Sequence, residues 1–366
     1  MNTSALSSQD KILPFEKLLH HNHERLVYHH DAETGLKVIV AIHNTTLGPA
    51  LGGARMWNYA SEAEALNDVL RLSRGMTYKS SLAGLDLGGG KAVLMGDPQK
   101  LKNEAYLRKY GQFIESLQGL YITAPDVNTN ISDMVHIAKE TKYVVGLPAT
   151  HDGSDDPSVL TAYGTYMSIK ALAKHLTGND SLAGKKIGIQ GIGKVGRALV
   201  DFLAKEESEM YVTDIVLDRT SAIAKLPKVH IITDADAFYD LDMDIYVPCA
   251  LGLTINDDTI ARLKCHGIAG AANNQLADEQ KHGAMLVKKG ILYAPDFLVS
   301  AGGVINVHTE YYGGYNKALA YQQVEHIYAT CLEILRIATA TNRPSQEVAM
   351  QLAEERILAI KNARLG

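Results

Sequence analysis

Hydrophobic and polar residues in the first half of the chain follow two different periods. The runs RLVYHHD and KVIVAIHN flank the turn-forming stretch 32–35, and this pattern predicts a β-hairpin. From Ser61 onward, apolar residues recur at helical spacing, and Ser61 with Glu64 has the spacing of a capping box. KAVLMG and YITAPDV predict short strands, whereas residues 102–118 and 131–140 predict helices. Because strands alternate with helices, this half is expected to form an α/β layer.

The second half of the chain shows the same alternation more regularly. It follows HDGSDDPS at 151–158, whose turn formers indicate a domain boundary, and a helix predicted from Val159 to about Leu176. The runs KKIGIQ, MYVTDI, VHIIT, DIYVPCA and HGIAGAA predict strands of a parallel, doubly wound sheet. The tail from about Asn316 is predicted to be helical, to break at Pro344 and to pack on the first domain.

Length and composition limit the class of protein. A chain of 366 residues suggests two domains, because a domain usually holds about 100–200 residues. A net charge of -5 without a basic run gives no reason to expect a nucleic-acid partner or an anionic membrane surface. No apolar run approaches the roughly 18 residues of a membrane span, and the N-terminus lacks the pattern of a secretory signal. Three separated cysteines are expected to be buried free thiols of a cytoplasmic protein.

One glycine-rich turn has the spacing of a dinucleotide-binding motif. It follows the apolar run KIGIQ, opens the helix RALVDFLAKE, and consists of Gly191, Ile192, Gly193, Lys194, Val195 and Gly196. Glycines at these places let backbone N–H groups approach a pyrophosphate at the helix N-terminus. Asp214 ends the next strand, where a carboxylate accepts hydrogen bonds from ribose hydroxyls and repels a 2′-phosphate. The motif predicts NAD as the cofactor; a ligand-free turn and a helix-capping aspartate are the alternatives.

Two lysines lie in unusual sequence surroundings. Lys79 ends the run MTYK at the end of a predicted helix, and Lys91 follows Gly88–Gly90 and is predicted to open a strand. Three glycines present no side chains, so that a substrate can approach the backbone closely. A partly buried lysine at this place would have a lowered pKa, toward the range of a general acid or base. A turn followed by a solvated lysine is the equally open alternative.

Polar residues also follow two other predicted strands. Asp126 ends YITAPD, where a carboxylate orients an amine or relays a proton, although a turn-forming role fits the sequence better. Asn273 and Asn274 follow HGIAGAA, at the ligand-binding edge of a parallel sheet, where they suit a substrate amine, the nicotinamide carboxamide or a turn. The histidines between His20 and His30 lack metal-binding spacing, and we expect surface histidines and no metal site.

Many separate runs of the sequence resemble one enzyme family, in the family's order and from about residue 24 to 360. They are TTLGPALGGARMW, LRLSRGMTYK, GLDLGGGKAV, YITAPDV, PCALGLTINDDTI, IAGAANNQL, YAPDF and AGGVINV. The chain is similar to the leucine/phenylalanine/valine branch of the glutamate dehydrogenase superfamily, most of all to the leucine dehydrogenases. The resemblance implies an α/β fold with two domains around a deep cleft. It assigns 1–150 with 330–366 to substrate binding and oligomerisation, and 151–329 to a Rossmann-type, doubly wound NAD-binding domain.

The resemblance also implies a reaction and a role for each candidate residue. The reaction is the reversible oxidative deamination of a branched-chain L-amino acid to a 2-oxo acid and ammonia, in which NAD takes the α-hydrogen as hydride. Lys91 is the catalytic lysine, which activates water, and Asp126 shares the proton transfers. The residues that bind the α-carboxylate and the α-amino group are Lys79, Gly52, Gly53 and Asn274. Asn273 joins the glycine turn and Asp214 as a cofactor-binding residue. The protein is expected to be a homo-oligomer, an octamer as in the family or a dimer.

The family's side-chain pocket corresponds to four apolar positions in this chain, which are Leu51, Ala124, Val304 and Val307. They predict use of leucine, isoleucine and valine, poor use of phenylalanine and almost none of glutamate. Three residues depart from the leucine-specific pattern: Pro125 and Asn128 are glutamate-like, and Ser300 replaces an asparagine. The alternatives are a valine or phenylalanine dehydrogenase of the same superfamily and a non-catalytic, NAD-sensing homologue.

Overall fold

The computed structural model describes residues 14–250 and 252–365 and divides into two compact units. Unit 1 comprises the chain up to Asp155 with Glu310–Tyr315 and the segment from Ile357, and unit 2 comprises Asp156–Thr309 with Asn316–Arg356. The first boundary, after Asp155, lies inside the stretch of turn formers at 151–158. Each unit contains its own β-sheet.

Unit 1 contains a five-stranded mixed sheet with the strand order β1-β2-β4-β3-β5. Its strands are β1 (Arg25–Asp31), β2 (Leu36–Asn44), β3 (Ala50–Trp57), β4 (Gly88–Met95) and β5 (Tyr121–Pro125). The predicted hairpin is confirmed, because β1 and β2 are paired and antiparallel; β2 is also antiparallel to β4. β3 runs parallel to both β4 and β5, so the carboxyl ends of these three strands point the same way.

Two features of this sheet differ from the expectations. The sequence pattern gives no strand over β3, whose central Gly52 and Gly53 have low strand propensity. The sheet needs a glycine there, because a Cβ at Gly52 would lie only 1.8 Å from the carbonyl oxygen of Gly90 on β4. Lys91 does not open a strand but lies inside β4, which already begins at Gly88.

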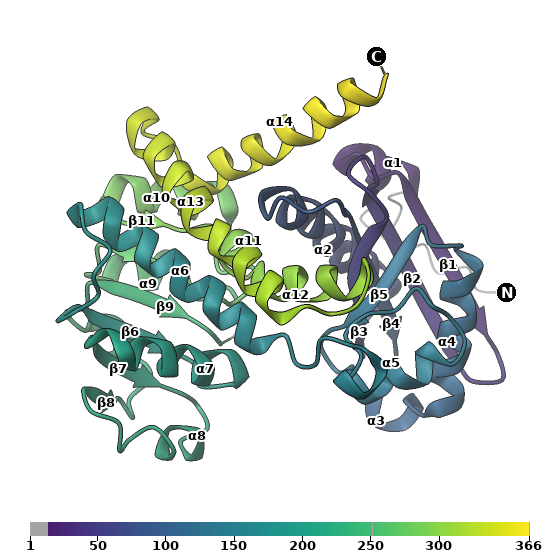
Figure 1. The fold of residues 1–366 in the computed structure, drawn as a ribbon, viewed down its shortest axis with the longest axis horizontal. Helices are drawn as coiled ribbons and strands as arrows, with labels where there is room; N and C mark the ends of the chain where they lie inside the picture. The colour runs from purple at the N-terminus through teal and green to yellow at the C-terminus, as the bar shows by residue number, and fades with distance from the viewer. Residues whose placement is uncertain (1–13, 251, 366) are drawn as a thin grey trace, which may run out of the picture. The chain divides into compact units, whose positions relative to one another are not determined.

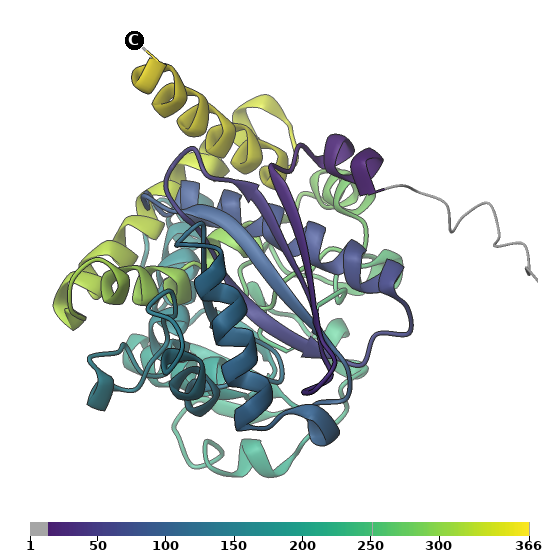
Figure 2. The same ribbon diagram turned by 90° about the vertical axis from the view of Figure 1, so that its right-hand side faces the viewer.

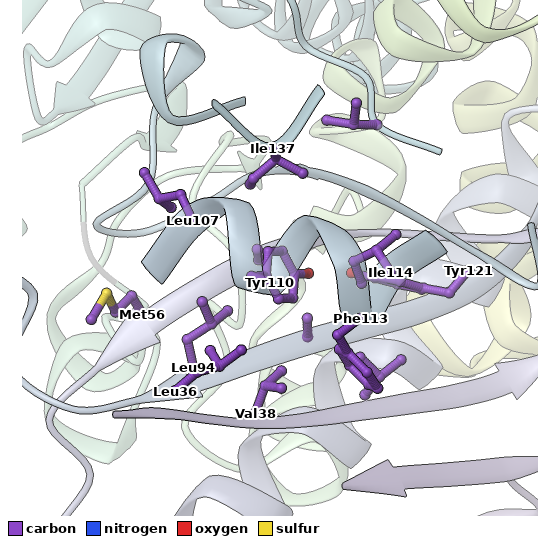
Figure 3. Packing of buried hydrophobic residues seen from close by; sticks show 14 of the residues in the cluster. Leu36, Val38, Met56, Leu94, Leu107, Tyr110, Phe113, Ile114, Tyr121 and Ile137 are labelled. Carbon is purple, nitrogen blue, oxygen red and sulfur yellow. The ribbon is translucent and has the colours of Figure 1, made fainter. Parts of the chain in front are cut away.

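Helices cover both faces of the unit 1 sheet (Figure 2). They are α1 (Pro14–His21), α2 (Glu62–Leu82), α3 (Pro98–Leu101), α4 (Glu104–Ser116) and α5 (Ile131–Ala138). α2 packs its Ala65 and Val69 on one face, and Ser61 caps it by accepting a hydrogen bond from the Glu64 N–H, as predicted. α4 and α5 pack on the other face, where Figure 3 shows Tyr110 of α4 above the strand residue Leu94.

Unit 2 contains a six-stranded sheet in which every neighbouring pair is parallel, with the order β11-β10-β9-β6-β7-β8. Its strands are β6 (Lys186–Gln190), β7 (Glu209–Thr213), β8 (Val229–Ile231), β9 (Ile245–Pro248), β10 (Gly267–Ile268) and β11 (Leu292–Tyr293). From the central β6 the chain moves outward through β7 and β8, then crosses to β9 and moves outward on the other side. This is the Rossmann order, and the α/β class with a doubly wound second sheet is confirmed.

The helices of unit 2 flank this sheet and continue into the C-terminal tail. They are α6 (Ser158–Thr177), α7 (Lys194–Leu203), α8 (Asp218–Ser221), α9 (Asp257–Arg262), α10 (Glu279–Lys289), α11 (Asp296–Val299), α12 (Gly302–Tyr311), α13 (Lys317–Thr341) and α14 (Ser345–Leu365). Short 3-10 helices lie at Ala149–His151, Ala204–Glu206 and Ala237–Asp240. Among the described residues, no helix combines the length and the apolar character needed to cross a bilayer.

The C-terminal tail is helical and breaks at Pro344, as predicted. Its packing differs from the expectation, because α13 lies along α6 (Figure 1) and the tail belongs to unit 2 as far as Arg356. Only the last residues, from Ile357, belong to unit 1, whereas 330–366 is expected to pack on the first domain. What each domain binds stays a prediction.

The histidines near the N-terminus occupy separate environments. Ring stacking places His29 on Phe113 of α4. His23 is buried beside α2, where its Nε2 lies 2.9 Å from the Ser73 hydroxyl, so the expectation of surface histidines is wrong for this residue. Within residues 14–250 and 252–365, no three His, Cys, Asp or Glu side chains are grouped so that they could hold a metal ion.

Candidate active site

The pleat of the unit 1 sheet places the candidate catalytic residues on its α2-covered face. Side chains alternate between the two faces of a strand, and Ala41 of β2 packs among the α2 contacts. Lys91 of β4 is the partner of Ala41 in the sheet register and therefore shares that face. The registers of β3 and β5 add Gly53 and Ala124 on the same face.

Lys91 and Asp126 form an ion pair at this face. The Lys91 Nζ lies 3.0 Å from Asp126 Oδ2, and Lys91 is only 6% exposed. Asp126 follows β5 in a tight turn, in which its backbone N–H donates to the Thr129 hydroxyl and its carbonyl accepts from the Thr129 N–H. The Thr129 hydroxyl also donates to the Ala54 carbonyl oxygen and so ties the turn to β3. Asp126 therefore has two roles that the sequence presents as alternatives, because it forms the turn and also pairs with an amine.

Burial and mutual attraction shift the pKa of both groups. Burial lowers the pKa of Lys91 below that of an ordinary lysine; the negative charge of Asp126 opposes this shift, and the positive charge of Arg55 adds to it. Burial raises the pKa of Asp126, but the charges and hydrogen bonds of Lys91 and Arg55 outweigh it and hold this pKa at about 2. Asp126 is therefore an anion at neutral pH, and Lys91 loses its proton more readily than a solvated lysine. The alternative of a solvated lysine is wrong.

Arg55 extends the ion pair into a network that sequence analysis missed. Its Nε donates to Asp126 Oδ2 at 2.9 Å, the oxygen that also contacts Lys91. Its Nη1 donates to Asp68 Oδ2 at 3.1 Å, and the Tyr59 hydroxyl donates to that same oxygen at 2.8 Å. These residues come from β3, from α2 and from the loop between them. Arg55 lies in the run GARMW, which matches the family but indicates no role for it, and Tyr59 and Asp68 lie outside the matching runs.

The glycines around Lys91 are required by packing inside unit 1. A Cβ at Gly89 would lie 2.2 Å from the Thr77 nitrogen of α2, and one at Gly90 would lie 2.7 Å from the Tyr121 ring. A Cβ at Gly53 would lie 2.7 Å from the Asp126 Cβ and 3.3 Å from the Lys91 Nζ. The space that side chains would take at Gly88, Gly89 and Gly90 is therefore filled by other residues of unit 1, which differs from the expectation that it admits a substrate, whereas Gly53 leaves room for the ion pair.

Other candidate residues of unit 1 lie on α2 and β3, which both pack against β4, the strand that carries Lys91. Lys79 lies in the last turn of α2, two residues beyond Thr77, which packs against Gly89 of β4. Leu51 is 1% exposed and lies on β3, on the same face as Gly53. A role for Lys79 in carboxylate binding stays a prediction, as does a role for Leu51 in the side-chain pocket.

Two of the departures from the leucine-specific pattern have structural explanations. Asn128 has a positive φ of 61°, which asparagine tolerates better than most residues, and its side-chain amide donates to the Met56 carbonyl oxygen. Pro125 ends β5 and packs against Gly146, where a Cβ would lie 2.5 Å from the proline ring. Both residues shape the turn that holds Asp126.

The glycine turn of unit 2 has the geometry of a dinucleotide-binding loop. Gly191 has a φ of 100° and packs on Ala250, and a Cβ at Gly196 would lie 2.0 Å from the Gly191 carbonyl oxygen. Gly193 is the N-cap of α7, and a Cβ there would meet no atom within 4 Å. Open space beside uncapped N–H groups at a helix N-terminus fits a pyrophosphate, so the residues present suit the predicted cofactor. Val195 lies in the first turn of α7.

The charged side chains near this loop are already paired within unit 2. Asp214 accepts hydrogen bonds from the Ile192 N–H at 2.6 Å and from the Val216 N–H at 2.7 Å, which tie the glycine loop to the end of β7. A carboxylate has about four lone-pair positions, so acceptor capacity remains for a ribose. The Lys194 ammonium forms an ion pair with Asp156 at 2.5 Å, so its predicted role in cofactor binding stays a proposal.

The remaining candidates of unit 2 follow β10 and lie on α12. Asn274 has a positive φ of 52°, and its carbonyl oxygen accepts from the Leu253 N–H. The hydroxyl of Ser300 donates to the Asp296 carbonyl oxygen and lies 3.4 Å from the amide oxygen of Asn273. Val304 and Val307 are buried and lie one turn apart on α12. The contacts of these residues with a ligand stay predictions.

A Rossmann-order sheet with a glycine turn after its central strand, in one chain with a buried lysine–carboxylate pair, is typical of a nucleotide-dependent oxidoreductase. Residues 23–143 match the model of the Glu/Leu/Phe/Val dehydrogenase dimerisation domain. Residues 210–363 match the model of the glutamate/leucine/phenylalanine/valine dehydrogenases. The chain belongs to the Glu/Leu/Phe/Val dehydrogenase family and is an amino-acid dehydrogenase.

Individual relatives cover almost the whole chain. A leucine dehydrogenase of Thermoactinomyces intermedius is 50% identical over 96% of this chain and 95% of its own length. A phenylalanine dehydrogenase of Caldalkalibacillus thermarum is 47% identical over 94% of this chain and 93% of its own length. The crystal structure of L-tryptophan dehydrogenase from Nostoc punctiforme is similar with a TM-score of 0.84 and 42% identity, over 95% of this chain and all of that one.

Proposed function

We propose that this protein catalyses the reversible, NAD-dependent oxidative deamination of branched-chain L-amino acids, above all leucine, to 2-oxo acids and ammonia. The observation that supports the chemistry most strongly is the contact between buried Lys91 and Asp126. A lysine with a lowered pKa beside a fixed carboxylate is an acid–base pair for deamination. A non-catalytic, NAD-sensing homologue would have no need to keep this costly buried charge.

In this proposal, the candidate residues of unit 1 bind the substrate and transfer protons. NAD⁺, when bound, supplies the hydride acceptor for the α-hydrogen of the substrate. Lys91, as a free amine, takes a proton from the water that adds to the substrate iminium carbon. Asp126 holds the lysine at 3.0 Å and assists the proton transfers that let ammonia leave the carbinolamine. Lys79 binds the substrate α-carboxylate beside Gly52 and Gly53, and so orients the α-carbon.

The cofactor is held by unit 2 in this proposal. The N–H groups at the start of α7 bind the pyrophosphate, and the open side of Gly193 gives it room. Asp214 accepts from the adenine-side ribose, and its charge disfavours the 2′-phosphate of NADP. Asn273 contacts the nicotinamide carboxamide, and Asn274 contacts the substrate α-amino group.

The proposed choice of substrate rests on four apolar positions, Leu51 and Ala124 in unit 1 and Val304 and Val307 in unit 2, each of which is buried. None supplies a cation, and an unpaired γ-carboxylate buried among such side chains costs several kcal/mol, roughly 2 or more. Each methylene of leucine that is buried there instead contributes about 0.8 kcal/mol. Leucine, isoleucine and valine are therefore the proposed substrates, and glutamate is disfavoured.

A substrate panel tests the proposal. The specificity constants kcat/KM for leucine, isoleucine, valine, phenylalanine and glutamate are measured at one pH through NADH formation. We expect the three branched-chain amino acids to lead, phenylalanine to follow far behind, and glutamate to be turned over hardly at all. Glutamate within about tenfold of leucine, a difference of only about 1.4 kcal/mol, would contradict the proposed pocket.

An aromatic substrate is the second candidate. The 47% identity to a phenylalanine dehydrogenase and the likeness to a tryptophan dehydrogenase favour it. Identity over the whole chain separates these activities poorly, because few residues form a side-chain pocket. In the same panel, phenylalanine or tryptophan as the best substrate would select this candidate.

We further propose that the protein is a homo-oligomer, of eight subunits or of two. The family model over residues 23–143 describes a dimerisation domain, which supports this proposal. Phe15 and Leu19 of α1 are 77% and 80% exposed, which is costly for large apolar side chains on a lone subunit. Light scattering tests the proposal: a mass near the 39.8 kDa of a single chain would contradict it.

A further inference from the structure

The proposed roles do not account for Arg55 or for Asp68, the second carboxylate with which Arg55 forms an ion pair. Arg55 is a largely buried cation on β3, with 18% of its side chain exposed, and it makes ion pairs with two different carboxylates. Its Nε contacts the oxygen of Asp126 that Lys91 also contacts. Two cations therefore share one carboxylate oxygen, an arrangement that needs a specific geometry to be stable.

Arg55 is also held by contacts on the side that faces away from Asp126. Asp68 accepts from the guanidinium at 3.1 Å and from the Tyr59 hydroxyl at 2.8 Å through one oxygen. Burial raises the pKa of Tyr59, and the hydrogen bond to Asp68 raises it further, so the phenol stays protonated and donates. The chain of contacts therefore runs from Tyr59 through Asp68 and Arg55 to Asp126.

We propose that Arg55 is a positioning residue for the deamination reaction, which holds the Asp126 carboxylate against Lys91 and is itself held by Asp68 and Tyr59. The inference rests on the proposed function, because it assigns Arg55 a task only if Lys91 and Asp126 transfer protons. A guanidinium suits this task, because its planar fork directs hydrogen bonds to two carboxylates at fixed angles, which an ammonium does not.

The charge of Arg55 also acts on Lys91. The charges that act on Lys91 include those of Asp126 after β5, Arg55 on β3 and Asp68 on α2. Nε and Nζ contact the same oxygen, so the two cations lie within about 6 Å, where like charges measurably disfavour one another. Arg55 therefore promotes release of the lysine proton, while Asp126 promotes its retention.

Three variants and the wild type test the inference by their pH profiles of kcat/KM and kcat with leucine. Arg55→Gln removes the charge and the fork, so we expect the rising limb of the profile to move about one unit to higher pH, and the rate below the limb to fall about tenfold. The rate should rise again at higher pH because Lys91 itself is intact, but only to a plateau no higher than that of Arg55→Lys, because the fork is lost in both variants. Arg55→Lys keeps the charge but loses the fork, so its limb stays near that of the wild type while kcat falls. Tyr59→Phe should give a smaller effect in the direction of Arg55→Gln.

A matched control separates positioning from general charge effects. Arg71 also makes an ion pair with Asp68, at 3.6 Å, but its side chain is 53% exposed and it makes no ion pair with Asp126. Arg71→Gln should therefore keep the wild-type profile. A limb that moves by as much in Arg71→Gln as in Arg55→Gln would overturn the inference.

The remaining outcomes distinguish this inference from the proposed function. If Lys91→Ala is inactive and Arg55→Gln has the wild-type profile, the inference is wrong and the proposed function stands. An equal loss at every pH in Arg55→Gln means a structural role and also overturns it. If Lys91→Ala stays active, the role of Lys91 is wrong and the inference about Arg55 falls with it, whereas the proposed function itself is wrong if the wild type forms no NADH from leucine. Should Arg55→Gln not fold, Arg55→Lys decides: lower kcat on an unmoved limb supports positioning, and wild-type kcat contradicts it.

Discussion

The two candidate sites of this chain are built from different materials. In unit 1, charged side chains from separate elements meet, and Asp126 joins the cations of Lys91 and Arg55 within hydrogen-bond distance. In unit 2, the site consists mostly of backbone. The glycine turn offers N–H groups and open space, because a Cβ placed on Gly193 would meet no atom within 4 Å.

This difference determines which kind of substitution should inactivate each site. A site made of side chains is disrupted when a charged group is removed, because its partners remain buried and unpaired. A site made of backbone is disrupted when a side chain is added, because the new atoms take the space of the ligand or collide with neighbouring backbone. Substitutions in the two units should therefore separate catalysis from cofactor binding, as the following experiments test.

The largest effect is expected for Lys91→Ala. Loss of a general acid–base group lowers the rate typically about 10²–10⁴-fold, so deamination should be almost abolished. The affinity for NADH, measured by fluorescence titration, should stay near that of the wild type, because the glycine turn is untouched. Near wild-type turnover would remove Lys91 from the mechanism, and loss of NADH affinity would show that the two sites are not separable.

A smaller but still large effect is expected for the choice of cofactor. The Asp214 carboxylate repels a 2′-phosphate, so kcat/KM should favour NAD over NADP by about 10- to 100-fold. Arg219 complicates the expectation, because its Nη1 lies 3.7 Å from Asp214 Oδ1 and its half-exposed side chain could reach a phosphate. Equal values for the two cofactors would mean that Asp214 does not face the ribose.

Two glycines of the same turn should respond differently. A Cβ at Gly196 would lie 2.0 Å from the Gly191 carbonyl oxygen, so Gly196→Ala should lower the free energy of unfolding by about 1–3 kcal/mol and weaken cofactor binding. Gly193→Ala should leave stability within about 0.5 kcal/mol of the wild type but still weaken NADH binding, because its Cβ enters the space proposed for the pyrophosphate. Thermal unfolding and NADH titration measure both effects. Unchanged NADH affinity in Gly193→Ala would place the cofactor elsewhere.

The smallest effect concerns the pH dependence of the wild type. Lys91 must lose its proton before it can accept one from water, so kcat/KM for deamination should rise with pH and fall about tenfold for each unit below the pKa of Lys91. Burial lowers that pKa, so the rising limb should lie below 10.5, the ordinary value for lysine. The reductive direction needs the ammonium form and should favour lower pH. A flat profile, or a limb at the ordinary value, would argue against Lys91 as the base.

Features encoded by neighbouring residues could be predicted from the sequence. The hairpin of β1 and β2, the N-cap Ser61 and the glycine turn before α7 all depend on contiguous stretches, and the structure has each of them. The helical tail and its break at Pro344 are of the same kind. Packing of the tail on α6 depends on distant contacts, and there the expectation was wrong.

The network around Lys91 could not be predicted, because it is assembled by the sheet register. Arg55 and Asp126 are 71 residues apart, and they meet only because β3 and β5 are neighbours with Ala54 opposite Pro125. No strand was predicted for β3, so this register could not be inferred. The sequence suggests substrate access at Gly89 and Gly90, because α2 and Tyr121, which fill the space beside them, come close only in the folded sheet.

The central claim, that this chain deaminates leucine, is tested most directly by the balance of its products. Purified protein is incubated with leucine and NAD⁺, and NADH, ammonia and 4-methyl-2-oxopentanoate are each quantified over time. The account predicts that the three form in equal amounts and that all three form about 10²–10⁴-fold more slowly with Lys91→Ala. Binding of NADH without formation of any product from leucine, isoleucine, valine or an aromatic amino acid would contradict it and indicate a non-catalytic, NAD-sensing protein.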